Sequence, residues 1–383
     1  MRDPRLDKLA NVLVNYCTSV KRGDLVTIVS DPDAMPAVEA TFEAVIRAGG
    51  HPTFHVRSDT LQELILRHGS DEQIQHVSPF EQHRLGYCDV LIVLRYQTNT
   101  RAFGRISPHK AAMAQASRRG LMAMSMQRAA RREMRYVLTE LPSNAAAQDA
   151  EMSLTEYTDW VFQAGFLHLT DPLRAWSALH AKQEVLRSYL QGKRQLRIQS
   201  PAVTRDANGR GHEGTDLTVD VSDRTWINCS GQENFPDGEV FTGPRSADGI
   251  VNFTYPAVYR GREVTGVRLQ FKAGHVVDAS ATKNEDYLLS LLDQDDGARN
   301  MGEIAIGTNS SITEFTKNAF YDEKIGGTFH LAVGAGYPET GNCNESGLHW
   351  DLVSDLRTGG SMHADGELFN QDGRILLAGW NDA

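Results

Sequence analysis

The N-terminal half of the sequence alternates short, continuous apolar runs with longer segments of helical periodicity. GDLVTIVSD (23–31) and CDVLIVLRY (88–96) are two such runs, and PAVEATFEAVIRAGG (36–50) lies between them. This middle segment opens with Pro36 and closes on two glycines, which are typical start and stop signals of a helix. Apolar strands separated by helices are typical of a parallel sheet covered on both faces. The pattern therefore predicts an α/β fold with a mainly parallel sheet.

After about residue 191 the pattern changes to short strands and hairpins. The segment 172–192 predicts a helix long enough to link two domains, and beyond it glycine and β-branched residues become dense. A chain of 383 residues is also long for a single core. We therefore expect an N-terminal α/β domain over residues 1–191, ending in the linking helix. A β-rich α+β domain over residues 192–383 is expected to follow.

Charge and cysteine usage narrow the possible partners and compartment. The formal net charge is −10, whereas nucleic-acid-binding surfaces are normally basic, so no nucleic-acid partner is expected. The four cysteines lie far apart without a C-x-x-C pair, which suits a reducing compartment. The first residues lack the apolar core of a signal peptide, and no run approaches the ~18 apolar residues of a membrane helix. We expect a soluble, cytoplasmic protein with no membrane partner.

Acidic residues in the second half occupy positions that suit metal ligands. Glu239 follows a Pro-Asp-Gly turn and precedes a predicted strand. Glu303 lies in a short apolar strand whose other alternate positions are Ala305 and Gly307. Because alternate residues share a face of a strand, these small neighbours leave open space beside the carboxylate.

Further candidates follow within the next 50 or so positions. DEKIGGTFHLAVGAGYP contains Glu323, His330 and Tyr337, and HWD contains His349 and Asp351. On an extended strand His349 and Asp351 project from the same face. They form either a pair of metal ligands or a hydrogen-bonded polar pair on a solvated face.

Each candidate also has an ordinary structural interpretation. Glu239 fits a solvated turn exit, His330 a core histidine, and Tyr337 a packing tyrosine before a proline turn. Glu303 is harder to place at the surface, because a lone carboxylate in an apolar strand requires a partner. Together the acids and histidines form a mixed oxygen and nitrogen donor set. Such a set suits zinc, cobalt, manganese or magnesium, and the lack of nearby cysteine argues against a structural zinc site.

Four motifs of the second half resemble, in order and spacing, those of the thermophilic-type metalloaminopeptidases, the aminopeptidase T and aminopeptidase S family. They are NFPDGEVFTGP (234–244), GEIAIGTN (302–309), DEKIGGTFHLAVGAGYPET (322–340) and NESGLHWD (344–351). The likeness extends over nearly the whole chain. It implies a homodimeric enzyme with an α/β N-terminal domain and a catalytic C-terminal domain that carries two divalent metals.

The resemblance also implies roles for individual residues. The implied metal ligands are Glu239, Glu303, Glu323, His330, His349 and Asp351, and Tyr337 matches the catalytic tyrosine of the family. Two metals would share a water, lower its pKa, and let it attack the first peptide bond of a peptide with a free N-terminus. Glu303 would bridge the metals or take the proton of the water. Tyr337 would donate a hydrogen bond to the oxyanion.

Two other functions remain open for such a sequence. Non-haem iron dioxygenases that open dihydroxypyridine rings look like distant relatives of this fold. They also use a terminal His-x-Asp with an upstream histidine around one iron. That site does not require Glu239 and Glu303, whose presence favours the hydrolase. The other alternative is a non-catalytic peptide- or metal-binding protein on the same scaffold.

Overall fold

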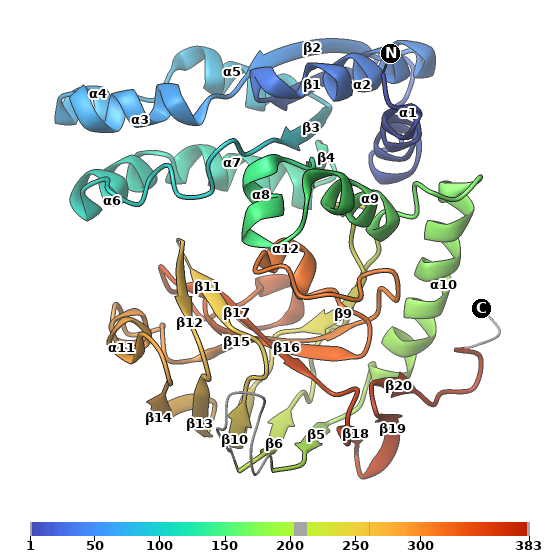
Figure 1. The fold of residues 1–383 in the computed structure, drawn as a ribbon, viewed down its shortest axis with the longest axis vertical. Coiled ribbons are helices and arrows are strands. Elements are labelled where there is room, and N and C mark those ends of the chain that lie inside the picture. The colour runs from blue at the N-terminus through green and yellow to red at the C-terminus, as the bar shows by residue number, and fades with distance from the viewer. Residues whose placement is uncertain (1, 203–212, 260, 381–383) are drawn as a thin grey trace. The chain divides into compact units, whose positions relative to one another are not determined.

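The computed structural model describes residues 2–202, 213–259 and 261–380 (Figure 1). The chain divides into two compact units. The first comprises Met1–Leu173 with Gly231–Pro236, and the second comprises Arg174–Ser230 with Asp237–Ala383. The long helix α10 (Pro172–Leu190) lies almost wholly within the second unit, whereas the sequence pattern places it at the end of the first. The domain boundary at residue 191 stays a prediction.

The first unit contains a five-stranded, wholly parallel sheet. Its strand order is β2 (His51–Val56), β1 (Leu25–Ser30), β3 (Val90–Arg95), β4 (Arg135–Glu140) and β8 (Asn234–Phe235). The centre of β1 is buried, as its continuous apolar run predicts, whereas β3 alternates buried and half-buried residues. The α/β fold with a parallel sheet is thereby confirmed. The short strand β8 comes from the second half of the sequence, which the sequence pattern does not reveal.

Helices connect these strands. They are α1 (Pro4–Asn11), a π-helical turn (Val12–Cys17), α2 (Met35–Ala48), α3 (Asp59–His68), α4 (Asp71–Gln75), α5 (Pro79–Tyr87), α6 (Pro108–Ser117), α7 (Arg119–Ala130), α8 (Asn144–Asp149) and α9 (Leu154–Ala164). Helix α2 ends at Gly49, whose φ of +86° is readily adopted by glycine. No helix among the described residues is both long and apolar enough to cross a membrane.

The second unit is built mainly from antiparallel strands, as the β-rich second half of the sequence predicts. The larger sheet has the order β14 (His275–Ser280), β13 (Arg268–Lys272), β10 (Ser246–Asn252), β6 (Thr215–Asp220), β5 (Gln195–Ser200), β18 (Ser361–Ala364), β19 (Glu367–Gln371) and β20 (Arg374–Ile375). The hairpin β11 (Ala257–Tyr259) and β12 (Arg262–Val264) and the helices α11 (Glu285–Leu292) and α12 (Ala319–Asp322) complete it.

A second, five-stranded antiparallel sheet positions the candidate site. Its order is β17 (His349–Asp355), β16 (Thr328–Gly334), β15 (Met301–Gly307), β9 (Glu239–Thr242) and β7 (Ile227–Cys229). Alternate residues such as Ile304, Leu331 and Trp350 belong to the hydrophobic core of the unit. Trp350, only 2% exposed, therefore packs inward. The residues that alternate with these core residues along each strand face the opposite side of the sheet.

Candidate metal centre

The strand register brings the candidate side chains to one face of the five-stranded sheet. In antiparallel strands, directly opposed residues project from the same face. Glu239 lies opposite Gly307, His330 opposite Ala305, Asp351 opposite Ala332, and His349 opposite Gly334. Glu303 is also opposite Ala332. Each of these five side chains thus has a glycine or an alanine as a cross-strand neighbour, which leaves room for several polar groups on one face.

The turn before Glu239 packs closely against Asn309 and requires a glycine. Gly238 has a φ of +137°, which side-chain-bearing residues rarely adopt, and a Cβ atom there would lie 2.5 Å from Asn309 Cβ. The carbonyl of Gly238 accepts a hydrogen bond from the N–H of Thr308 at 2.8 Å. The Pro-Asp-Gly turn of the sequence therefore needs its glycine at this position.

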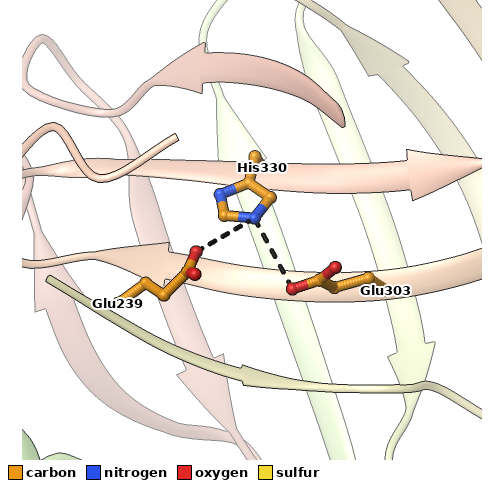
Figure 2. Close-up of side chains that lie close together, drawn as sticks. All are labelled: Glu239, Glu303 and His330. Atoms are coloured by element: carbon orange, nitrogen blue, oxygen red, sulfur yellow. Dashed lines mark ion pairs between the residues drawn. The ribbon is translucent and has the colours of Figure 1, made fainter. Parts of the chain in front are cut away.

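Figure 2 shows the first group of converging side chains, formed by Glu239, Glu303 and His330. His330 Nε2 lies 3.3 Å from Glu239 Oε2 and 3.7 Å from Glu303 Oε1. All three side chains are buried. Each offers a ligand atom, and these atoms lie within 4.8 Å of one another, which is close enough to hold one metal ion.

Two further groups overlap with the first. Glu303, His349 and Asp351 form one, in which His349 Nε2 lies 3.4 Å from Glu303 Oε2 and 3.6 Å from Asp351 Oδ1. Glu323, His330 and Asp351 form the other. The structure thus brings together all six residues that the family resemblance implies as ligands. Glu303 belongs to two of these groups, one that contains His330 and one that contains His349.

Both histidines have the orientation that metal-ligating histidines usually show. The Nδ1–H of His330 donates to the backbone carbonyl of Glu323 at 3.0 Å. The Nδ1–H of His349 donates to the carbonyl of Ala335 at 2.8 Å. Because a carbonyl oxygen only accepts, Nδ1 of each ring carries a proton. Each Nε2 is left to face the carboxylates.

Tyr337 lies at the edge of these groups. Its phenolic oxygen is 3.4 Å from His349 Nε2, and its ring contacts the rings of Phe241 and His349 edge to face, with centroid distances of 5.1 and 5.2 Å. Burial, followed by the nearby carboxylates Glu303 and Asp351, raises the pKa of Tyr337 far above its usual value. The phenol therefore stays protonated and can donate a hydrogen bond.

Burial and mutual charge set the protonation of the remaining groups. Burial opposes ionisation of Glu303, but hydrogen bonds from His330 and His349 outweigh it and lower the pKa of Glu303 to about 2. Burial likewise opposes the imidazolium forms, but the carboxylates raise the pKa of both histidines to about 10. Burial raises the pKa of Asp351 to about 6 and that of Glu239 well above its usual value. The metal-free site therefore retains protons at neutral pH.

The site contains one further charged residue that sequence reasoning missed. Lys324 is completely buried, and its ammonium forms ion pairs with Glu323 and, at 3.8 Å, with Glu239 Oε1. Burial disfavours its charge, but the two carboxylates raise its pKa, so that it remains a cation. The only sequence signal for this role is that Lys324 directly follows Glu323. A lysine in the polar segment DEKIGG is otherwise typical of a solvated residue.

The residues present fit a divalent metal. Glu239 Oε2 and Asp351 Oδ1 are buried and accept no hydrogen bond from the described part of the chain. Burying a carboxylate oxygen without a hydrogen bond is unfavourable, and a cation bound between these oxygens and the histidine Nε2 atoms, which lie 3.3 and 3.6 Å from them, would offset this cost. Carboxylate oxygens with imidazole nitrogens suit zinc, cobalt, manganese and magnesium.

Comparison with known proteins identifies the family. The profile of the thermophilic metalloprotease (M29) family matches residues 2–374. The chain belongs to this family. Among its relatives, aminopeptidase 2 of Geobacillus stearothermophilus is 25% identical over 363 residues, which cover 88% of this chain and 84% of the relative. Aminopeptidase T of Thermus aquaticus is 32% identical over 200 residues, 47% of this chain and 45% of the relative.

Two solved structures share the fold of this M29 chain. Wild-type AmpT from Thermus thermophilus superposes with a TM-score of 0.82 at 21% identity, over 98% of this chain and 99% of the other. The 2,5-dihydroxypyridine dioxygenase of Pseudomonas putida KT2440 superposes with a TM-score of 0.60 at 12% identity, over 98% of both chains. At such identities the similarity establishes the fold alone.

Proposed function

We propose that the chain is a metal-dependent aminopeptidase whose site holds two divalent ions. M29 membership and the similarity to aminopeptidases support the activity. The observation that carries the two-ion proposal is the placement of Glu303 between His330 and His349. Its two oxygens lie 3.7 and 3.4 Å from the two Nε2 atoms, so that one carboxylate serves two groups of ligands.

The proposed ligands all lie in the second unit of the chain. They are Glu239, Glu303, Glu323, His330, His349 and Asp351. When bound, the two ions supply a water of lowered pKa and polarise the scissile carbonyl. Zinc, cobalt, manganese and magnesium all fit this donor set.

The residues of the chain then have distinct tasks. Glu303 would help to hold both ions or would accept the proton of the attacking water, and its place in two groups supports the first role. Tyr337 keeps its proton and donates a hydrogen bond to the developing oxyanion. An aminopeptidase acts on the first residue of a peptide, so the proposed substrates are peptides with a free N-terminus.

We also propose a cytoplasmic homodimer. The resemblance to the metalloaminopeptidases supports the dimer. The cysteines Cys17, Cys88, Cys229 and Cys343 form no disulfide with one another, which suits a reducing compartment.

A ring-cleaving iron dioxygenase is the second candidate, since the dioxygenase structure shares the fold. His330, His349 and Asp351 alone would satisfy one iron. The burial of Glu239 and Glu303 beside them favours the hydrolase instead.

One experiment separates these functions. Purified protein is incubated with short peptides bearing either a free or an acetylated N-terminus, with and without chelator. We expect release of the first residue from free peptides alone, lost with chelator and restored by added metal. Oxygen uptake with dihydroxypyridine by protein holding about one iron per chain would contradict the proposal. Chelator-resistant peptide binding without cleavage would identify a binding protein.

A further inference from the structure

Lys324 places a fixed positive charge inside a site proposed to bind cations. The residue follows helix α12 and has no exposed surface. Its backbone N–H donates to the carbonyl of Tyr321 at 3.0 Å, and its carbonyl accepts from the N–H of Asn309 at 3.1 Å. The ammonium also lies 5.6 Å from the centre of the Phe320 ring. Both polar groups of the Lys324 backbone are hydrogen-bonded and its side chain is fully buried. The ammonium is therefore held in place.

The contacts of Lys324 are distributed unequally over the three ligand groups. Its ammonium pairs with Glu239, which belongs to the group that contains Glu303 and His330. It also pairs with Glu323, which belongs to the group that contains His330 and Asp351. None of its ion pairs within the described chain reaches Glu303, His349 or Asp351. The lysine therefore neutralises carboxylates on the His330 side of the site and leaves the His349 side without such compensation.

This distribution affects the two proposed ions differently. An ion on the His330 side would share Glu239 and Glu323 with the ammonium and would be repelled by it. Low dielectric strengthens this repulsion in a buried site. An ion on the His349 side meets Glu303 and Asp351, which have no lysine partner.

We propose that Lys324 makes the two metal positions unequal: the position at His349 binds first and tightly, and the position at His330 binds weakly and exchanges. This inference rests on the proposed two-ion function. Lys324 is then a positioning residue. It holds Glu239 and Glu323 in place and balances their charge while the weak position is empty.

The test is a metal titration of the chelator-treated full chain with zinc, followed by calorimetry and by competition with a chelating dye. We expect two steps with dissociation constants that differ by at least about tenfold. Lys324→Met, of similar shape but neutral, should strengthen the second step by at least about tenfold and leave the first almost unchanged. Lys324→Arg, which keeps the positive charge, should keep the difference between the two dissociation constants. Lys283→Met, which removes an exposed lysine paired with Glu263, is the matched control and should bind as the unmodified chain does.

The assignment of the two steps has its own test, which does not depend on the Lys324 variants being folded. His349→Gln should abolish the tight step and His330→Gln the weak one. Two equal steps, the reverse assignment, or a second step weakened in folded Lys324→Met would overturn the inference. Failure of the unmodified chain to bind two ions would instead overturn the proposed function, so the two failures are distinguishable.

Discussion

His349 Nε2 and Glu303 Oε2 lie 3.4 Å apart although their strands, β17 and β15, are not neighbours in the sheet. Strand β16 runs between them and contributes Ala332 and Gly334 at the intervening positions. The small side chains let the glutamate and the histidine reach over the central strand. Glu303 therefore contacts both histidines, and this arrangement underlies the first prediction.

Glu303→Gln should lower kcat/KM for unblocked peptides by about three orders of magnitude, because an amide at this position ligates metal more weakly and accepts no proton. Metal content, measured by elemental analysis, should fall below that of the unmodified chain. Glu314→Gln, at an exposed position, is the matched control and should retain full activity. Full activity in Glu303→Gln would remove this carboxylate from the mechanism.

Metal binding should release protons at neutral pH. In the metal-free site the pKa values of His330 and His349 are raised to about 10, so both rings are charged below that pH. A metal binds only the neutral imidazole, so affinity should rise with pH up to about 10 and then level off. Calorimetry in two buffers of different ionisation enthalpy measures the release directly. A binding heat that is independent of the buffer would contradict this protonation state.

Tyr337→Phe should reduce kcat by about 10²-fold or more, with little change in KM or metal content, because it removes one hydrogen bond to the oxyanion. The ring contacts with Phe241 and His349 remain, so the fold should be kept. Tyr189→Phe, which removes a hydroxyl bonded to Glu367, is the control. Equal rates for the Tyr337 variant and the unmodified chain would make Tyr337 a packing residue.

Gly238→Ala should destabilise the chain by about 2–4 kcal/mol, because the new Cβ meets Asn309 and the backbone is strained. The change should also weaken metal binding, since Glu239 follows directly. Thermal unfolding with and without metal measures both effects. In contrast, Gly120→Ala in helix α7, where a Cβ meets nothing within 4 Å, should be neutral or stabilising by up to about 1 kcal/mol. Similar stability for both variants would show that the turn adapts.

Periodicity in the sequence predicted strands at Glu303 and at His349–Asp351, and the shared face of His349 and Asp351. Ile304, Leu331 and Trp350 alternate with Glu303, His330 and His349, and a strand places alternate residues on opposite faces. Glu323 could not be placed in this way, because it lies after the short helix α12 rather than on a strand. Only the fold brings it within reach of His330 and Asp351.

The sequence by itself determined the local features: parallel strands in the first half, antiparallel strands in the second, and acids and histidines at alternate positions beside small residues. The tertiary structure alone decided which strands are neighbours. It placed β8 in the parallel sheet and Glu303 between two histidines, and it buried Lys324 against two carboxylates. The physical reason is that periodicity reports the environment of a residue relative to its own strand. Pairing between distant strands, and the burial of a charge beside them, depend on contacts that no local pattern records.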